Sequence, residues 1–224
     1  MQSYYDKILS AEKLMRVYEI APPRVRQYLD AEVDHVLQCI RSDDTILELG
    51  CGYGRILPSL ARKSKMVIGI DTSLGTLLLG HEMLFGITHC RLLQMNAIQL
   101  AFSDFAFDCV VCIQNGISAF HVDQQHLIRE SIRVTKPGGI VLFSSYSDTF
   151  WKNRLEWFRL QAEADLLGEI DDEKTKNGMI VCKDGFTATT VNEGQFESLT
   201  RDLNVETHIV EVDESSLFCE IIPH

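Results

Sequence analysis

Three alternating glycines stand in the stretch of the sequence best suited to bind a ligand. Residues 45–55 read Thr-Ile-Leu-Glu-Leu-Gly-Cys-Gly-Tyr-Gly-Arg. Glycine adopts positive φ angles and has no side chain, so Gly50, Gly52 and Gly54 let a ligand approach backbone N–H groups. An apolar run precedes the glycines, and a helix-compatible stretch, residues 56–61, follows them. A strand, a glycine turn and a helix in this order favour a nucleotide-like ligand.

The spacing of the glycines distinguishes between classes of ligand. A dinucleotide site carries G-x-G-x-x-G with the pyrophosphate on the helix N-terminus. Read from Gly50 or from Gly52, this chain lacks the third glycine, and Arg55 takes its place in the first frame. Glu48 stands just before the glycines, where a carboxylate would repel a phosphate but could orient a cationic amino acid. The pattern therefore disfavours a nicotinamide dinucleotide.

A second acidic residue, Asp71, ends the apolar run Met-Val-Ile-Gly-Ile. It lies about 20 residues beyond the glycine turn, where a carboxylate can accept hydrogen bonds from both ribose hydroxyls. The alternative is that Asp71 caps the helix that begins near Thr72 or Ser73. The position favours a ribose without identifying the rest of the ligand.

The pattern E-x-G-x-G-x-G after an apolar strand resembles the first motif of the class I S-adenosylmethionine-dependent methyltransferases of the small-molecule, type 11/25-like kind. The loop 100–108 and the turn Lys-Pro-Gly-Gly at 136–139 resemble two further signatures of that family. The resemblance is close over residues 43–145. It implies an α/β fold: a three-layer, doubly wound, Rossmann-like sheet of seven strands, mostly parallel, with an antiparallel C-terminal edge pair.

The resemblance also implies which residues hold S-adenosylmethionine and its product S-adenosylhomocysteine. Asn96 replaces the acidic residue that commonly contacts the adenine amino group, and an amide oxygen can still accept that bond. Gln114 follows the fourth strand, at the point of the sheet where ligands of this fold bind. The expected cofactor-binding residues are Glu48, Gly50, Cys51, Gly52, Gly54, Asp71, Thr72, Asn96, Ala97 and Gln114.

The implied reaction is direct displacement, which moves the methyl group in line from the sulfonium to an acceptor. A general base is needed only if the acceptor still holds its proton at working pH. The polar residues near the predicted strand ends are Asn115, His121, Tyr146 and Asp148. Our hypothesis is that Asn115 positions the substrate and His121 acts as the base, although a lone histidine in a loop is more often a surface residue.

The elements that must position these residues can be read from hydrophobic periodicity and turn residues. Two helices, 1–20 with a break near Ser10 and 24–40, precede the first strand and are separated by Ala-Pro-Pro. Tyr4, Tyr5 or Tyr18 could reach the ligand from there. The pattern further predicts helices over 72–85, 124–135, 149–167 and 193–201, a hairpin on an Asp-Gly turn over 181–187, and strands over 46–49, 66–71, 91–95, 109–113, 140–144, 205–212 and 217–222.

The length of 224 residues suits one substantial domain. We expect an N-terminal helical cap (1–42), a cofactor-binding core (43–145), a substrate-cap insertion (146–192) and a C-terminal helix with edge strands (193–224). Additions to the minimal fold, such as the 181–187 hairpin, usually shape the substrate pocket. The identity of the methyl acceptor, and any oligomeric state, cannot be read from these patterns.

The charge composition of the chain excludes some classes of binding partner. The formal net charge of −11 argues against a nucleic-acid or anionic-membrane surface, because such surfaces need clustered Lys and Arg. The expected partner is therefore a small molecule. No signal peptide opens the chain and no apolar stretch is long enough to span a bilayer, so a cytoplasmic location is expected.

Seven scattered cysteines make a disulfide framework unlikely to form, and no metal is expected. Cys109 and Cys112 form a C-x-x-C inside an apolar run, where residues three apart on a strand point to opposite faces. Packing is therefore favoured over zinc or redox chemistry. Two alternatives to a methyltransferase remain at this stage: a nicotinamide-dependent oxidoreductase and a non-catalytic S-adenosylmethionine-binding protein.

Overall fold

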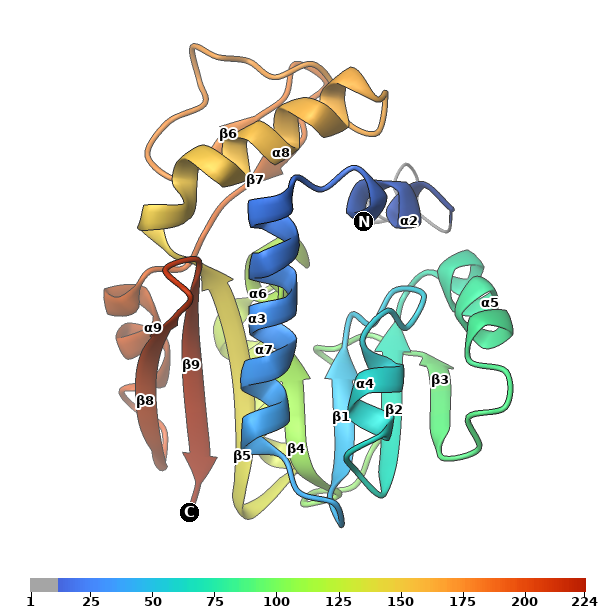
Figure 1. Cartoon of the computed structure of the whole chain (residues 1–224). Helices are drawn as coiled ribbons and strands as arrows, with labels where there is room; N and C mark the ends of the chain where they lie inside the picture. Colours follow the sequence, from blue (N-terminus) through green and yellow to red (C-terminus); the bar gives the residue numbers. More distant parts are fainter. Residues whose placement is uncertain (1–11) are drawn as a thin grey trace.

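A seven-stranded sheet forms the middle layer of the computed structural model, which describes residues 12–224 (Figure 1). Its first five strands in the chain run parallel, and β9 is antiparallel to both of its neighbours. The doubly wound sheet with an antiparallel edge pair is thereby confirmed. In spatial order the strands are β3 (Cys90–Gln94), β2 (Met66–Asp71), β1 (Thr45–Leu49), β4 (Phe107–Cys112), β5 (Thr135–Tyr146), β9 (Ser216–Pro223) and β8 (Val205–Val212).

Helices cover both faces of the sheet (Figure 1). One face carries α3 (Pro23–Cys39), α4 (Leu57–Ala61) and α5 (Leu74–Met83), and the other carries α6 (Gly116–Ala119), α7 (Gln124–Val134) and α9 (Glu193–Thr200). The central strands are buried on both sides, as parallel strands between helix layers must be. Ile46 packs on the α3 face, whereas Leu47 packs on the α7 face.

A further group of elements lies over the carboxyl ends of the strands (Figure 1). This cap consists of α2 (Glu12–Glu19), the 3-10 turn η1 (Asp148–Phe150), α8 (Trp151–Glu163), and the hairpin of β6 (Ile180–Val181) and β7 (Thr187–Ala188). It has its own apolar cluster, which includes Val17, Trp157 and Phe186. The Trp157 Nε1–H donates to the Val17 carbonyl at 3.0 Å, and this bond ties α8 to α2.

The predicted helices and strands are present over the described residues, with three differences beyond shifts of one or two residues at their ends. The helix predicted over 149–167 is a 3-10 turn followed by α8, which ends at Glu163. Residues 114–118, expected as a loop, contain the one-turn helix α6, which starts after two residues in the left-handed region. The fifth strand begins at Thr135 and not at Ile140, because residues 136–139 form a bulge between two paired stretches of β4 and β5. Gly138 has a φ of +71°, so the predicted glycine turn persists inside this bulge. Tyr4 and Tyr5 lie outside the described residues.

The cysteines pack as the strand periodicity indicates. Cys109 and Cys112 are fully buried and belong to the clusters on opposite faces of β4. None of the seven cysteines forms a disulfide. Within residues 12–224 we find no helix with the length and apolar character that crossing a membrane requires.

Candidate cofactor and acceptor site

A cavity of about 300 Å³ lies between the carboxyl ends of β1–β5 and the cap. Its walls come from the glycine loop, the ends of β2 and β5, the loops after β3 and β4, and the cap elements α2, α8 and the hairpin turn. It brings together many of the residues expected to hold the cofactor: Gly50, Gly52, Asp71, Thr72, Asn96, Ala97 and Gln114. Glu48, Cys51 and Gly54 belong to the same loop but do not line this cavity.

The glycine loop needs its glycines because its backbone adopts positive φ angles. Gly50, Gly52 and Gly54 have φ angles of +70°, +56° and +78°, a region that side chains disfavour. At Gly50 a Cβ atom would also meet Phe120 ring carbons at 2.5 Å. The loop is therefore a bare backbone surface, with Gly50 and Gly52 facing the cavity.

The Asp71 carboxylate accepts hydrogen bonds from the protein backbone and also faces the cavity. One carboxylate oxygen accepts the Gly52 N–H at 2.9 Å and the other accepts the Ser73 N–H at 2.8 Å. The N-cap of α5 is Ser73, whose hydroxyl accepts from the Thr76 N–H, so Asp71 is not the cap. Asp71 also lines the cavity, so its carboxylate is adjacent to a ligand bound there.

Glu48 is a buried carboxyl with an unsatisfied oxygen. Its side chain is 7% exposed, and Oε2 has no hydrogen-bond partner among the described residues. Burial raises the pKa of Glu48 to about 8, Arg55 opposes that rise and Asp71 adds to it. The Nη2 atom of Arg55 is likewise buried without a partner within residues 12–224. The Arg55 guanidinium lies 4.7 Å from the centre of the Tyr18 ring, which lines the cavity.

The end of β4 is held in an unusual backbone conformation. Gln114 and Asn115 have φ angles of +56° and +62°. The Gln114 N–H donates to Glu32 Oε2 at 2.8 Å, and the Gln114 side chain accepts from the Tyr18 hydroxyl at 3.0 Å. Glu32 is fully buried, and burial raises its pKa to about 7 against the opposing effect of the hydrogen bonds that it accepts from Ser216 and Gln114. Gln114 thus faces the cavity because Glu32 fixes its backbone.

The two residues of the catalytic hypothesis lie away from the cavity walls. The Asn115 amide donates to the Thr189 carbonyl at 2.9 Å and accepts from the Ser145 hydroxyl at 2.8 Å, so it braces the cap against the sheet. His121 is exposed and does not line the cavity. Of the other polar candidates, Tyr146 lines the cavity whereas Asp148 is exposed at the start of η1.

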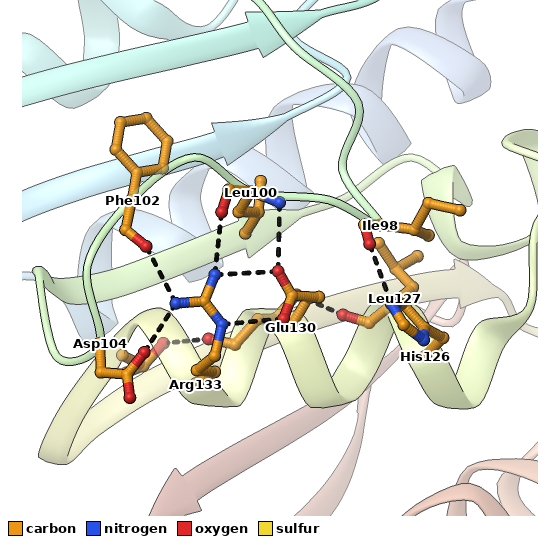
Figure 2. A network of polar contacts seen from close by, with 10 residues as sticks. Ile98, Leu100, Phe102, Asp104, His126, Leu127, Glu130 and Arg133 are labelled. Carbon is orange, nitrogen blue, oxygen red and sulfur yellow. Dashed lines mark hydrogen bonds and ion pairs between the residues drawn. The ribbon is translucent and has the colours of Figure 1, made fainter.

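The loop after β3 is fixed by α7. Asn96 Oδ1 accepts the Ile98 N–H at 3.1 Å. Figure 2 shows the Arg133 guanidinium reaching the carbonyl oxygens of Leu100 and Phe102, each at 2.9 Å. Glu130 pairs with Arg133 and accepts the Leu100 N–H at 3.1 Å. This clamp holds the segment that carries Asn96 and Ala97 against the cavity.

Several lining residues come from the cap and were not assigned to the site from sequence. They are Trp157, Phe158, Gln161, Leu167 and Phe186. Phe120, which directly follows α6 outside the cap, also lines the cavity and was not assigned either. In the sequence they read as ordinary apolar or helical positions, because no local motif shows which strand ends the cap covers. Tyr18 was expected as one of three tyrosines that could reach the ligand, and it does line the cavity.

Known proteins share the central part of this chain. Residues 46–139 match the family model of the methyltransferase domain. A ubiquinone biosynthesis O-methyltransferase of Alkalilimnicola ehrlichii is 33% identical over 121 residues, which are 50% of this chain and 47% of the relative. A demethylmenaquinone methyltransferase of Clavibacter sepedonicus is 32% identical over 104 residues, which are 46% of this chain and 42% of the relative. The chain spans about half the length of the curated relatives it matches.

Solved structures extend the likeness to the whole fold. A SAM-dependent methyltransferase from Methanosarcina mazei superposes with a TM-score of 0.62 at 20% identity, covering 84% of this chain and 96% of that one. One from Aquifex aeolicus gives a TM-score of 0.62 at 15% identity, covering 92% and 96%. The motif order, strand order and family match agree. Residues 46–139 are thus similar to the methyltransferase domain family, and the fold over most of the chain is the one found in S-adenosylmethionine-dependent methyltransferases.

Proposed function

We propose that this chain transfers the methyl group of S-adenosylmethionine to a small-molecule acceptor held under the cap. The supporting observation is that one cavity joins the glycine loop and Asp71 to the aromatic side chains of α8 and the hairpin. A donor bound at the loop and an acceptor bound at the cap would share this space. A nicotinamide-dependent oxidoreductase has no comparable support, since the dinucleotide glycine spacing is missing.

The loop residues fit the donor's functional groups. Gly50 and Gly52 allow close approach to the backbone, and Asp71 can accept hydrogen bonds from ribose hydroxyls. The unsatisfied atoms of Glu48 and Arg55 match the ammonium and carboxylate of an amino acid. We therefore assign the amino-acid end of the donor to the side of Glu48 and Arg55, which adjoins the cavity through Leu49, Gly50 and Tyr18, and the adenine to Asn96 and Ala97.

The protein's main contribution to the reaction is alignment. When bound, S-adenosylmethionine supplies an electrophilic methyl carbon on a good leaving group. The cap, with α2 tied to α8 through Trp157, excludes water from the cavity and holds the acceptor in line. Such positioning can lower a barrier by about 7 kcal/mol or more. Asn115 serves as a positioning residue, because its bonds to Ser145 and Thr189 fix the cap over the strand ends.

The acceptor is a small molecule in this proposal. The printed names of the relatives refer to ubiquinone and menaquinone biosynthesis, which describes those proteins. The matched family segment ends at residue 139, whereas much of the acceptor side here comes from residues 146–192. A small, largely apolar acceptor agrees with the cavity walls.

A labelled-methyl experiment tests the proposal. Protein is incubated with methyl-labelled S-adenosylmethionine and a metabolite extract, and label in small molecules is followed by chromatography. We expect wild-type protein to label a discrete product and Asp71→Ala to lose that product through weak donor binding. Asp148→Ala is the matched control, because Asp148 is an exposed aspartate outside the cavity. Donor binding without any labelled product would contradict the catalytic proposal.

A further inference from the structure

The cap places a buried glutamine without a partner in the cavity wall. Gln161, in the last part of α8, is 4% exposed and lines the cavity. Its carboxamide makes no hydrogen bond to any residue in the described part of the chain. Its polar atoms are not fully enclosed by protein, so they open onto the cavity, where a bound ligand can pair with them. A carboxamide offers two donors and one acceptor oxygen to a ligand.

Aromatic rings form the walls around Gln161. Trp157 and Phe158 come from α8, Phe186 from the hairpin turn and Tyr146 from the end of β5. The Phe158 and Phe186 rings are close to parallel, at 29° with their centroids 6.3 Å apart. Flat apolar walls of this kind favour stacking and edge contacts with a planar ring.

The charge around this part of the cavity disfavours an ionic acceptor. Asp71, on the donor side, is the only Asp, Glu, Lys, Arg or His among the described residues that line the cavity. The buried Arg154 lies behind the walls, with its guanidinium carbon 4.6 Å from the Tyr146 centroid and 5.5 Å from that of Phe158. Those ring faces already contact a cation, and its charge repels a second one. A carboxylate or phosphate would find no ion-pair partner at the surface.

On the acceptor side, the described lining residues offer no Asp, Glu, Lys or His side chain that could take the proton of the acceptor. We propose that the acceptor is a planar aromatic compound bearing an acidic hydroxyl group, which Gln161 orients and which reacts as the phenolate formed in solvent. This inference rests on the proposed methyl transfer. The hydroxyl loses its proton to solvent, and an oxygen lone pair then forms the O–C bond to the methyl carbon. The S–C bond breaks as this bond forms, and its electron pair stays on sulfur as neutral S-adenosylhomocysteine leaves.

Ligand binding tests the chemical class. In a Trp151→Phe background, Trp157 is the sole tryptophan, so its fluorescence reports on the cavity. The protein is loaded with S-adenosylhomocysteine and titrated with 4-cyanophenol, 4-methylphenol, benzoate and benzylamine. We expect saturable quenching by both phenols and at least about tenfold weaker binding of benzoate and benzylamine. Equal or tighter binding of either charged probe, or no binding of the phenols, would overturn the proposal.

The pH dependence of methyl transfer tests whether the hydroxyl of the acceptor loses its proton to solvent before it reacts. With S-adenosylmethionine, methylation of the two phenols is measured against pH. We expect each rate to rise with the ionisation of its own phenol, so the more acidic 4-cyanophenol reacts faster at neutral pH. A common pH profile for both phenols would indicate a base on the protein and would contradict the inference.

Gln161→Leu separates recognition from folding. The substitution keeps the approximate size of the side chain and removes its polar atoms. We expect phenol binding to weaken about tenfold, S-adenosylhomocysteine affinity to stay the same, and the melting temperature to stay or rise. Gln125→Leu, at an exposed position of α7, is the control and should change none of the three.

The outcomes separate the two proposals. A lower melting temperature with unchanged phenol binding in Gln161→Leu would make Gln161 a structural residue. Failure of wild-type protein to bind S-adenosylhomocysteine would defeat the proposed function itself, whereas binding of that ligand without binding of phenols defeats only the acceptor assignment.

Discussion

Donor binding should drive a proton off Glu48. Its carboxyl is 7% exposed and has a pKa of about 8, raised by burial against the opposing effect of Arg55. At pH 7 roughly nine-tenths of the free protein therefore holds this proton. A ligand ammonium beside Glu48 favours the ionised form. If the pKa falls by about two units in the complex, binding at pH 7 releases about 0.8 proton and strengthens with rising pH.

Calorimetry measures this release directly. S-adenosylhomocysteine is titrated at pH 7 in two buffers of different ionisation enthalpy, and the difference in heat gives the number of protons. In Glu48→Gln we expect the release to disappear and the affinity to fall by about 1.5–3 kcal/mol, the contribution of a charge-assisted hydrogen bond. Glu197→Gln is the control, because Glu197 is an exposed carboxyl on α9 outside the cavity. Equal release from wild type and Glu48→Gln would refute the assignment of the ammonium to Glu48.

Three further predictions concern stability. The pKa of Glu32 is raised to about 7 from an ordinary 4.5, so its contribution to the free energy of unfolding is full below about pH 4.5 and is lost as pH rises through 7. Urea unfolding of the wild type at pH 4.5 and at pH 8 should show this loss. In Glu32→Gln the difference between the two pH values should be smaller by about 3 kcal/mol. Arg133→Leu should lower the free energy of unfolding at pH 7 by about 1–3 kcal/mol, because it releases the loop after β3. The control Arg159→Leu should change it little, because Arg159 is exposed and forms an ion pair with Asp172 at the surface. Gly50→Ala should lower the free energy of unfolding by about 1–3 kcal/mol through its positive φ and the contact with Phe120, whereas Gly75→Ala, with open space around it, should not lower it. Equal effects of the two substitutions would contradict this account of the loop.

The sheet and the donor side could be predicted because local patterns determine them. Alternating glycines after an apolar run, and an acid ending the next run, place Gly52 and Asp71 at adjacent strand ends once β1 and β2 pair in parallel. The hydrogen bond between the Gly52 N–H and Asp71 is the direct result. These relations span short stretches of chain and need no knowledge of the cap.

The acceptor side could not be predicted in the same way. Asn115 follows β4 directly, yet its amide is taken up by Ser145 and by Thr189, which is 74 residues further along the chain. Gln161 reads as one more polar position in an amphipathic helix, and only the packing of α8 over the strand ends turns it into the cavity. The left-handed backbone of Gln114 is equally hidden, since it depends on the Glu32 carboxylate from α3.

The most direct measurement of the central claim is the heat of binding of S-adenosylhomocysteine to purified protein, compared with that of NADH. The bare glycine loop and the Asp71 carboxylate predict saturable binding of S-adenosylhomocysteine, about tenfold or more weaker in Asp71→Ala, and no binding of NADH. An absence of heat with S-adenosylhomocysteine, or tighter binding of NADH, would contradict the account of this site.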